Sequence, residues 1–321
     1  MQPGRKFSPN PGKADFANLL GAAKRQTVAV PSRKIIFTTF GGGTQHFHDH
    51  AALLGEEARR TGWFSDVRVW TDQSVFGPIF EKTPSAGLQS LSMADILDCQ
   101  FAQTNRRGFG YWIWKPAVIE RMLRETDDGD LIVYADAGTE ISTAGRDRFR
   151  EYVQMADTSG GLFFSLGGLK TVCWTKTEVV NHLKVTAEEL LLDQIQAALF
   201  LIRNGAEGRQ FIADWLTLCR TDSYRLLDDR LDLAIQQPEF VENRHDQALL
   251  SILARRSAFT IILGENDHNA RSFPPSSPLY LFPFHNTRGP AVRRIFRTSR
   301  LPLNYLRRKN RDALAAKPVP V

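Results

Sequence analysis

The pattern of hydrophobic and polar positions divides the chain into segments typical of strands and of helices. Short runs of consecutive apolar residues predict buried strands, and apolar residues three or four apart predict helices. The strand-like segments are 34–40, 67–70, 131–134, 162–166 and 259–263. Helical spacing occurs in 51–61, 96–104, 118–123, 146–155, 179–192, 194–204, 211–219 and 246–254. Strands alternating with helices predict an α/β domain with a Rossmann-like, mixed and mainly parallel sheet flanked by helices.

The stretch from Gly108 to Glu140 joins several of these features. An aromatic and glycine-rich segment, GFGYWIWKP, precedes a helical pattern, a turn at 127–129 and a buried strand that ends on Asp136. Open α/β sheets hold their ligands at the carboxyl ends of their strands. We therefore expect Asp136 to face a ligand, although a structural role in holding the following loop is an alternative.

Four motifs together carry a resemblance. They are GFGYWIWKP at 108–116, YADAG at 134–138, WTK at 174–176 and ENRHDQ at 242–247. In this order and spacing they resemble a group of bacterial GT-A type glycosyltransferases, over roughly 34–285. The resemblance implies a GT-A-like fold, a nucleotide-sugar donor (a UDP-sugar is expected) and a glycan or lipid-linked acceptor in cell-surface polysaccharide or lipopolysaccharide assembly.

Sugar transfer from a nucleoside diphosphate passes through an oxocarbenium-like transition state and leaves negative charge on the diphosphate. GT-A enzymes usually neutralise that charge through a metal held by a D-x-D pair. Here Gly138 stands where the second acid would be, and Glu140 is a possible substitute. The resemblance implies that His285 completes a metal site with Asp136, for Mn²⁺ or Mg²⁺. The alternative for His285 is an ordinary surface loop residue.

The remaining site assignments follow the motifs. Asp246 is the candidate general base or acceptor-binding carboxylate, because a helix N-terminus favours its charged form, and helix capping is the alternative. Lys115 and Arg107 flank the aromatic cluster and are candidate cations facing the diphosphate; the alternative is that they are exposed and idle. Residues assigned to the donor are Thr39, Phe40, Gly41, Arg107, Tyr111, Trp114, Lys115, Asp136, Ala137 and Gly138, and those assigned to the acceptor are Trp174, His245, Asp246 and Gln247. Packing explains Trp174 equally well.

Two other patterns suggest different chemistry. Gly41, Gly42 and Gly43 after the first strand suit either a tight turn or a donor-contacting loop. Their spacing is not the dinucleotide fingerprint and no clear acidic ribose-binding residue follows, which argues against an NAD-type oxidoreductase. His46, His48 and His50 would share one face of an extended segment, as metal ligands do. The alternative is a polar loop in which Asp49 caps the next helix.

Composition adds limits of its own. The 321 residues are 42% hydrophobic and 24% charged, as in ordinary globular proteins. Cys99, Cys173 and Cys219 suggest reduced core thiols rather than a disulfide framework or a zinc site. The sequence contains no apolar run of about eighteen residues and no secretory h-region, so we expect a cytoplasmic protein.

The ends of the chain differ from its centre. Residues 1–32 are rich in Pro, Gly and basic residues and are predicted to form a flexible arm, residues 33–290 the folded domain, and residues 291–321 a basic amphipathic tail. Alternating arginines and apolar residues suit an anionic membrane surface, which would make the protein peripheral. A solvated tail is the main alternative. Nucleic acid is not expected, because no nucleic-acid-binding motif accompanies the tail.

Two functions remain at this point. The first is a glycosyltransferase. The second, suggested by the missing second acid, is a catalytically silent protein of the same fold that binds nucleotides or glycans.

Overall fold

The computed structural model describes residues 33–72, 74–75, 92–265 and 281–286. The predicted arm and basic tail lie outside the described residues. The described residues from Lys34 onward belong to one compact unit.

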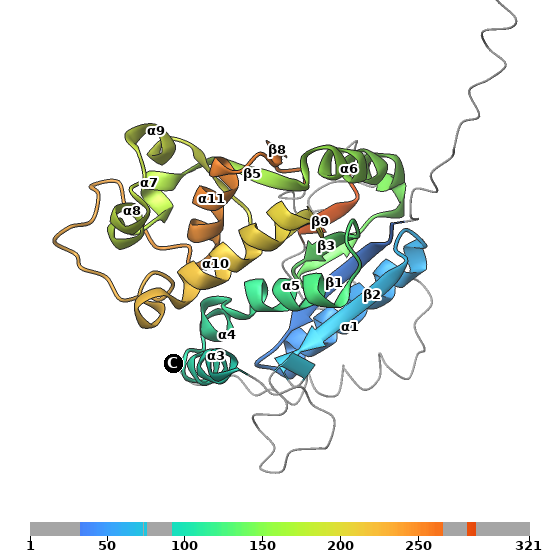
Figure 1. Cartoon of the computed structure of the whole chain (residues 1–321), viewed down its shortest axis with the longest axis horizontal. Helices are drawn as coiled ribbons and strands as arrows, with labels where there is room; N and C mark the ends of the chain where they lie inside the picture. The colour runs from blue at the N-terminus through green and yellow to red at the C-terminus, as the bar shows by residue number, and fades with distance from the viewer. Residues whose placement is uncertain (1–32, 73, 76–91, 266–280, 287–321) are drawn as a thin grey trace, which may run out of the picture. The chain divides into compact units, whose positions relative to one another are not determined.

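A seven-stranded mixed sheet is the centre of this unit (Figure 1). The order is β2-β1-β3-β7-β5-β6, with β8 also pairing with β5. Strand β1 is parallel to both β2 and β3, and β5 is parallel to β8, whereas β7 and β6 run antiparallel to their neighbours. Five of the seven strands thus point the same way, which confirms the predicted α/β fold with a mixed, mainly parallel sheet. The strands are β1 (Ile35–Gly41), β2 (Asp66–Thr71), β3 (Leu131–Ala135), β5 (Gly161–Lys170), β6 (Asp193–Ile195), β7 (Leu199–Arg203) and β8 (Thr260–Leu263).

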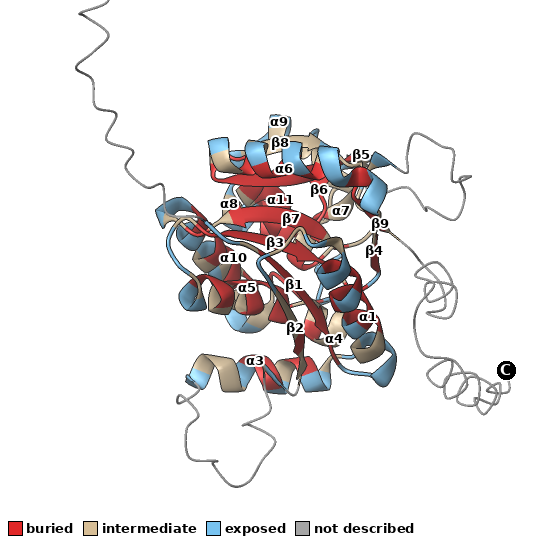
Figure 2. Ribbon diagram, turned by 90° about the vertical axis from the view of Figure 1, so that its right-hand side faces the viewer, coloured by how far each residue is buried: buried red, intermediate tan, exposed pale blue. Residues whose placement is uncertain are grey.

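Helices cover both faces of the sheet. Along β3, Leu131, Val133 and Ala135 face one core while Ile132 and Tyr134 face the other, as the alternation of a strand requires. Helices α1 (Gln45–Thr61) and α6 (Arg146–Ser159) cover the first face, and α5 (Trp114–Glu125), α10 (Ala206–Tyr224) and α11 (Asp246–Arg256) cover the second. Figure 2 shows the strands buried between helices whose outer sides are exposed.

Shorter elements complete the described chain. They are α3 (Met93–Thr104), α4 (Gly108–Tyr111), β4 (Thr139–Ile141), the 3-10 turn η1 (Thr143–Gly145), α7 (Thr171–Trp174), α8 (Thr177–Leu183), α9 (Ala187–Leu190) and β9 (Phe284–Asn286).

One element was predicted wrongly. The segment 194–204 was expected to be an amphipathic helix, but it forms β6 and β7, and β7 is a central strand next to β3. Its side chains from Leu199 to Ile202 are fully buried. A short run buried on both sides has no polar face, so periodicity cannot distinguish a strand from a buried helix there.

The prediction of an extended segment at His46, His48 and His50 was also wrong. Helix α1 begins at Gln45, six residues earlier than expected, and includes His46, His48 and His50. The N-cap residue is Thr44, and Asp49 accepts a hydrogen bond from the Gln45 side chain inside the first turn. The three histidines therefore do not share one face of an extended chain, and Asp49 is not the cap.

His285 lies on a strand rather than in a loop. It belongs to β9, which pairs antiparallel with β4 and places His285 directly opposite Glu140. Both side chains are buried. The carboxyl end of β3 is thus connected to the late part of the chain through a two-stranded sheet four residues beyond Asp136.

Two further predictions concern the described chain. All three cysteines are free; Cys99 and Cys219 are buried, as expected for core thiols, whereas Cys173 is partly exposed. Within the described ranges, no helix is both long enough and apolar enough to cross a bilayer.

Candidate active site

Three segments far apart in sequence meet at the side chain of Lys115. Lys115 lies in the first turn of α5, Asp136 follows the last residue of β3, and Asp246 is the first residue of α11. The Lys115 ammonium lies 3.1 Å from Asp136 Oδ1, 3.3 Å from Asp246 Oδ2 and 3.0 Å from the carbonyl oxygen of Ala197. The structure therefore joins the predicted donor-side carboxylate to the predicted acceptor-side carboxylate through one cation.

Lys115 is not exposed and idle, as the alternative held. It lies on a helix with its side chain 2% exposed and with the protein's own oxygens as its partners, and its contact with a diphosphate stays a prediction. Burial acts to lower the pKa of Lys115, but the charges of Asp136 and Asp246 outweigh burial and the pKa is raised. Lys115 is thus a fixed internal cation.

The two carboxylates differ in their surroundings. The side chain of Asp246 is 4% exposed, whereas that of Asp136 is 33% exposed. Burial raises the pKa of Asp246 to about 6, and the neighbouring ammonium offsets only part of that effect. A carboxylate with this pKa can accept a proton near neutral pH, as a general base must.

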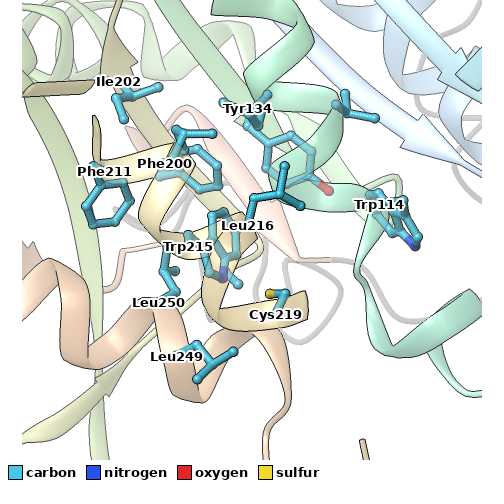
Figure 3. Close-up of a cluster of buried hydrophobic side chains, with 14 of the residues drawn as sticks. Trp114, Tyr134, Phe200, Ile202, Phe211, Trp215, Leu216, Cys219, Leu249 and Leu250 are labelled. Atoms are coloured by element: carbon cyan, nitrogen blue, oxygen red, sulfur yellow. The ribbon is translucent and has the colours of Figure 1, made fainter. Parts of the chain in front are cut away.

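Tyr134 fixes the orientation of Asp136, and sequence analysis missed it. Its hydroxyl donates to Asp136 Oδ1 at 2.5 Å, from a ring that is completely buried and stacked beside Phe200 (Figure 3). Burial and the adjacent carboxylate raise the pKa of Tyr134 well above its usual value. Residues two apart on a strand share a face, so the Y-x-D spacing was the available signal.

Asp136 is therefore anchored through one oxygen only. Both Tyr134 and Lys115 contact Oδ1, and within the described residues Oδ2 has no hydrogen bond or ion pair. Asp136 can offer this oxygen to a ligand without losing either anchor.

A divalent metal ion would find few protein ligands here. The described residues contain no group of three or more His, Cys, Asp or Glu side chains that could hold a metal ion. Asp136 Oδ2 and the imidazole of His285 would supply at most two ligands. Mg²⁺ is commonly bound by one or two carboxylates together with substrate phosphates and water. The assignment of Asp136 and His285 to a metal site stays a prediction.

The aromatic cluster at 108–116 is mostly packing. Trp114 is buried, stacks on Phe40 at 3.9 Å between ring centroids, and donates its indole N–H to the carbonyl oxygen of Gly108. Gly41 touches α1 closely, because a Cβ there would lie 2.1 Å from the carbonyl oxygen of Phe47. Thr39 is completely buried. Contact of these residues with a donor stays a prediction.

The two residues that follow Asp136 in the YADAG motif differ in exposure. Ala137 is buried, whereas Gly138 is exposed. Their assignment to the donor also stays a prediction.

A buried hydrogen-bond network holds the N-terminal half of α11 against the sheet. Gln194 on β6 donates to the hydroxyl of Thr175 and accepts from Gln247 at 3.3 Å and from Ser251 at 3.3 Å. Gln194 was not among the predicted site residues, because its segment was expected to be a helix. The network fixes Gln247, the residue after Asp246, to the sheet.

The WTK motif anchors a long connection between α10 and α11. The completely buried Lys176 donates to the carbonyl oxygens of Asp228 and Arg230, at 2.7 Å and 3.2 Å. Burial lowers the pKa of Lys176. One face of the Trp174 ring is covered by the guanidinium of Arg244, 4.3 Å from the ring centroid.

His245 has an unusual backbone conformation for a residue other than glycine, with φ of 56° and ψ of −122°. Its ring lies against Tyr111 and Trp112, and Nδ1 donates to the carbonyl oxygen of Leu227 at 2.7 Å. Burial lowers the pKa of His245 to about 4, so the ring is neutral. Strained residues of this kind persist where surrounding packing determines them, often at functional sites.

Arg107 and Tyr111 were assigned to the donor, but their contacts are with the connection before α11. Arg107 pairs with Asp229 at 3.4 Å and with Glu242 at 3.2 Å. After burial, the charge of Asp229 is the main influence raising the pKa of Tyr111. The structure thus brings these two residues to the ENRHDQ motif.

No protein-family profile matches the sequence, and a comparison with curated proteins found no match. Solved structures give distant similarities. The galactosyltransferase LgtC in complex with donor and acceptor sugar analogues is 10% identical over 85% of this chain and 99% of its own, with a TM-score of 0.41. A glycosyltransferase involved in glycosylation of the major capsid of PBCV-1 is 10% identical over 82% of this chain and 99% of its own, with a TM-score of 0.37. The bifunctional IspDF from Campylobacter jejuni is 8% identical over 73% of this chain, with a TM-score of 0.33, and this chain spans 50% of its length.

Proposed function

We propose that this protein is a glycosyltransferase that moves a sugar from a nucleotide-sugar donor to a glycan or glycolipid acceptor in cell-surface polysaccharide assembly. The observation that carries the proposal is the connection from Asp136 through Lys115 to Asp246. Three motifs that resemble those of GT-A enzymes form one network of charges, with a half-exposed acid at the carboxyl end of a buried strand.

Each residue of the network has a distinct task in this proposal. Asp136 presents Oδ2 to the donor, held in place by Tyr134 and Lys115. Asp246 accepts the proton of the acceptor hydroxyl, which its raised pKa allows. If a divalent ion binds, Asp136 and His285 hold it, and its charge neutralises the departing diphosphate.

A donor panel tests the proposal. Purified protein is incubated with UDP-, GDP-, CMP- and dTDP-sugars, with Mn²⁺, with Mg²⁺ and with a chelator, and the released nucleotide is measured. We expect release from one donor class, reduced at least 100-fold in Asp136→Asn and in Asp246→Asn. Failure to bind or hydrolyse any donor would refute the proposal.

One observation favours a second candidate, a catalytically silent binding protein of the same fold. Gly138 occupies the position of the second acid, so the loop after β3 carries a single carboxylate. Such a protein would bind a nucleotide or glycan without turnover, and Asp136→Ala would then weaken binding but have no turnover to remove. An enzyme would lose turnover while remaining folded.

A further inference from the structure

A row of paired charges runs from the WTK motif to the aromatic cluster. It consists of Arg244, Glu242, Arg107 and Asp229, with Trp174 at one end and Tyr111 at the other, and we call it the polar row. Arg244 covers the Trp174 ring and pairs with Glu242 at 3.2 Å. Arg107 then pairs with both Glu242 and Asp229. Segments near residues 107, 174, 229 and 242 thus form one continuous surface.

The stability of the fold does not explain this row. Its four charged side chains are between 38% and 46% exposed. Ion pairs at such exposure typically contribute about 0–1 kcal/mol to the free energy of unfolding. Each guanidinium and carboxylate also keeps hydrogen-bonding capacity beyond its partner, because a guanidinium has five donors and a carboxylate about four acceptor positions.

A buried acceptor atom next to the row points to a ligand. Because His245 Nδ1 donates to a carbonyl oxygen, the neutral ring carries a lone pair on Nε2. Nε2 is buried and has no hydrogen-bond partner in the described part of the chain. Its nearest charged neighbour is Asp229 Oδ1, at 3.6 Å, which is also an acceptor. Two acceptors this close repel each other unless a donor reaches one of them, and the hydroxyl group of a ligand is such a donor.

The net charge of the polar row favours the acceptor over the nucleotide-sugar donor as its ligand. Two arginines and two carboxylates sum to zero, so the row lacks the excess positive charge that a diphosphate requires. Alternating donors and acceptors between two aromatic rings suit the hydroxyl groups and apolar faces of sugars. The row also leads directly to the proposed base, because Glu242 and Arg244 lie four and two residues before Asp246.

We propose that the polar row binds the acceptor as an extended chain of several sugar residues, rather than binding the donor. This inference rests on the proposed function, because it takes Asp246 to mark the acceptor side of the site. It reassigns Arg107 and Tyr111 from the donor to the acceptor.

The test measures the two ligands separately on the full chain. Glycan binding is measured on an array of bacterial oligosaccharides of one to six sugars, followed by calorimetry with the tightest ligand. Nucleotide binding is measured by calorimetry with UDP, GDP, CMP and dTDP in the presence of Mn²⁺. The variants are Arg107→Ala and Glu242→Gln. Arg121→Ala is the matched control, because Arg121 is 42% exposed and paired with Glu125 on α5, outside the row.

We expect glycan affinity to rise with chain length up to at least three sugars, and to fall at least tenfold in both row variants but less than twofold in the control. Nucleotide affinity should stay within twofold of wild type in all three. A tenfold loss of nucleotide affinity in Arg107→Ala would overturn the inference and restore the donor assignment. Absence of binding to any glycan longer than one sugar would also overturn it. If no nucleotide binds wild type, the proposed function fails, while the glycan measurements still decide the role of the row.

Discussion

The buried carboxylate of Asp246 should make the protein less stable than it would be without that charge. Burial raises the pKa of Asp246 in the folded state to about 6, from the ordinary value of 3.8 for an aspartate side chain. The folded state then binds the proton more tightly than the unfolded state, so stability falls as the pH rises from about 4 to about 6. A difference of about two pKa units corresponds to about 3 kcal/mol.

The substitution Asp246→Asn removes this ionisation and keeps the shape of the side chain. We therefore expect the variant to be more stable than wild type by up to about 3 kcal/mol at pH 7–8, with most of the gain lost at pH 4, where Asp246 is protonated in the folded wild type and partly protonated in the unfolded chain. Turnover should nevertheless be lost. A stabilising change that removes activity is the trade-off expected at an active site.

Urea unfolding at five pH values between 4 and 8 measures this difference directly. Asp136→Asn is the matched control. Wild-type Asp136 pairs with the same ammonium of Lys115, but its side chain is 33% exposed, so removing its charge should relieve little of the free-energy cost of burying a carboxylate. A stability gain for Asp246→Asn that is the same at pH 4 and pH 8 would contradict the reasoning. A loss of stability at pH 8 would show that the pair with Lys115 outweighs the cost of burial.

Three further substitutions test other contacts. Tyr134→Phe removes only the hydroxyl on Asp136 and should reduce turnover at least tenfold. Tyr152→Phe, which removes a similar buried contact to Glu265 outside the site, should leave turnover unchanged, and equal losses in the two variants would argue against a positioning role. Lys176→Met should destabilise the fold by about 1–3 kcal/mol, measured by urea unfolding, since it leaves the carbonyl oxygen of Asp228 without its buried donor, whereas the Asp228 carboxylate keeps its pair with Arg230. Gly110→Ala should lower the melting temperature more than Gly129→Ala. Both glycines have positive φ, but only at Gly110 would the added Cβ meet another atom, the Ala102 Cα at 2.5 Å. Equal melting temperatures of the two variants would contradict this reasoning.

Much of the fold could be predicted because local pattern and burial agree. The strand at 131–134 is flanked by a turn and is wholly apolar, and it forms β3 as expected. The helix at 246–254 has clear spacing and forms α11. The segment 194–204 failed because nothing in its sequence records that the sheet continues on both sides of it. Its structure was decided by pairing partners on β3, 64 to 72 residues away, and on β5, 39 to 41 residues away from β7.

The candidate site was predictable as residue types but not as contacts. The motifs identified Asp136, Lys115 and Asp246 separately. That one ammonium joins the two acids depends on the packing of α5 and α11 against the sheet, which no spacing within a motif encodes. For the same reason no motif predicted the partners of Arg107, because Asp229 and Glu242 are more than 120 residues downstream.

The separation of these partners along the chain has a consequence during synthesis. A growing polypeptide presents Lys115 and Asp136 long before Asp246 emerges from the ribosome, and during that interval the ammonium has only one of its two carboxylates. Helix α11 must dock before the network is complete, so any product that terminates ahead of residue 246 lacks a finished centre, however well β1, β2 and β3 have assembled. The network of Asp136, Lys115 and Asp246 therefore forms only after α11 has been synthesised and has packed against the sheet.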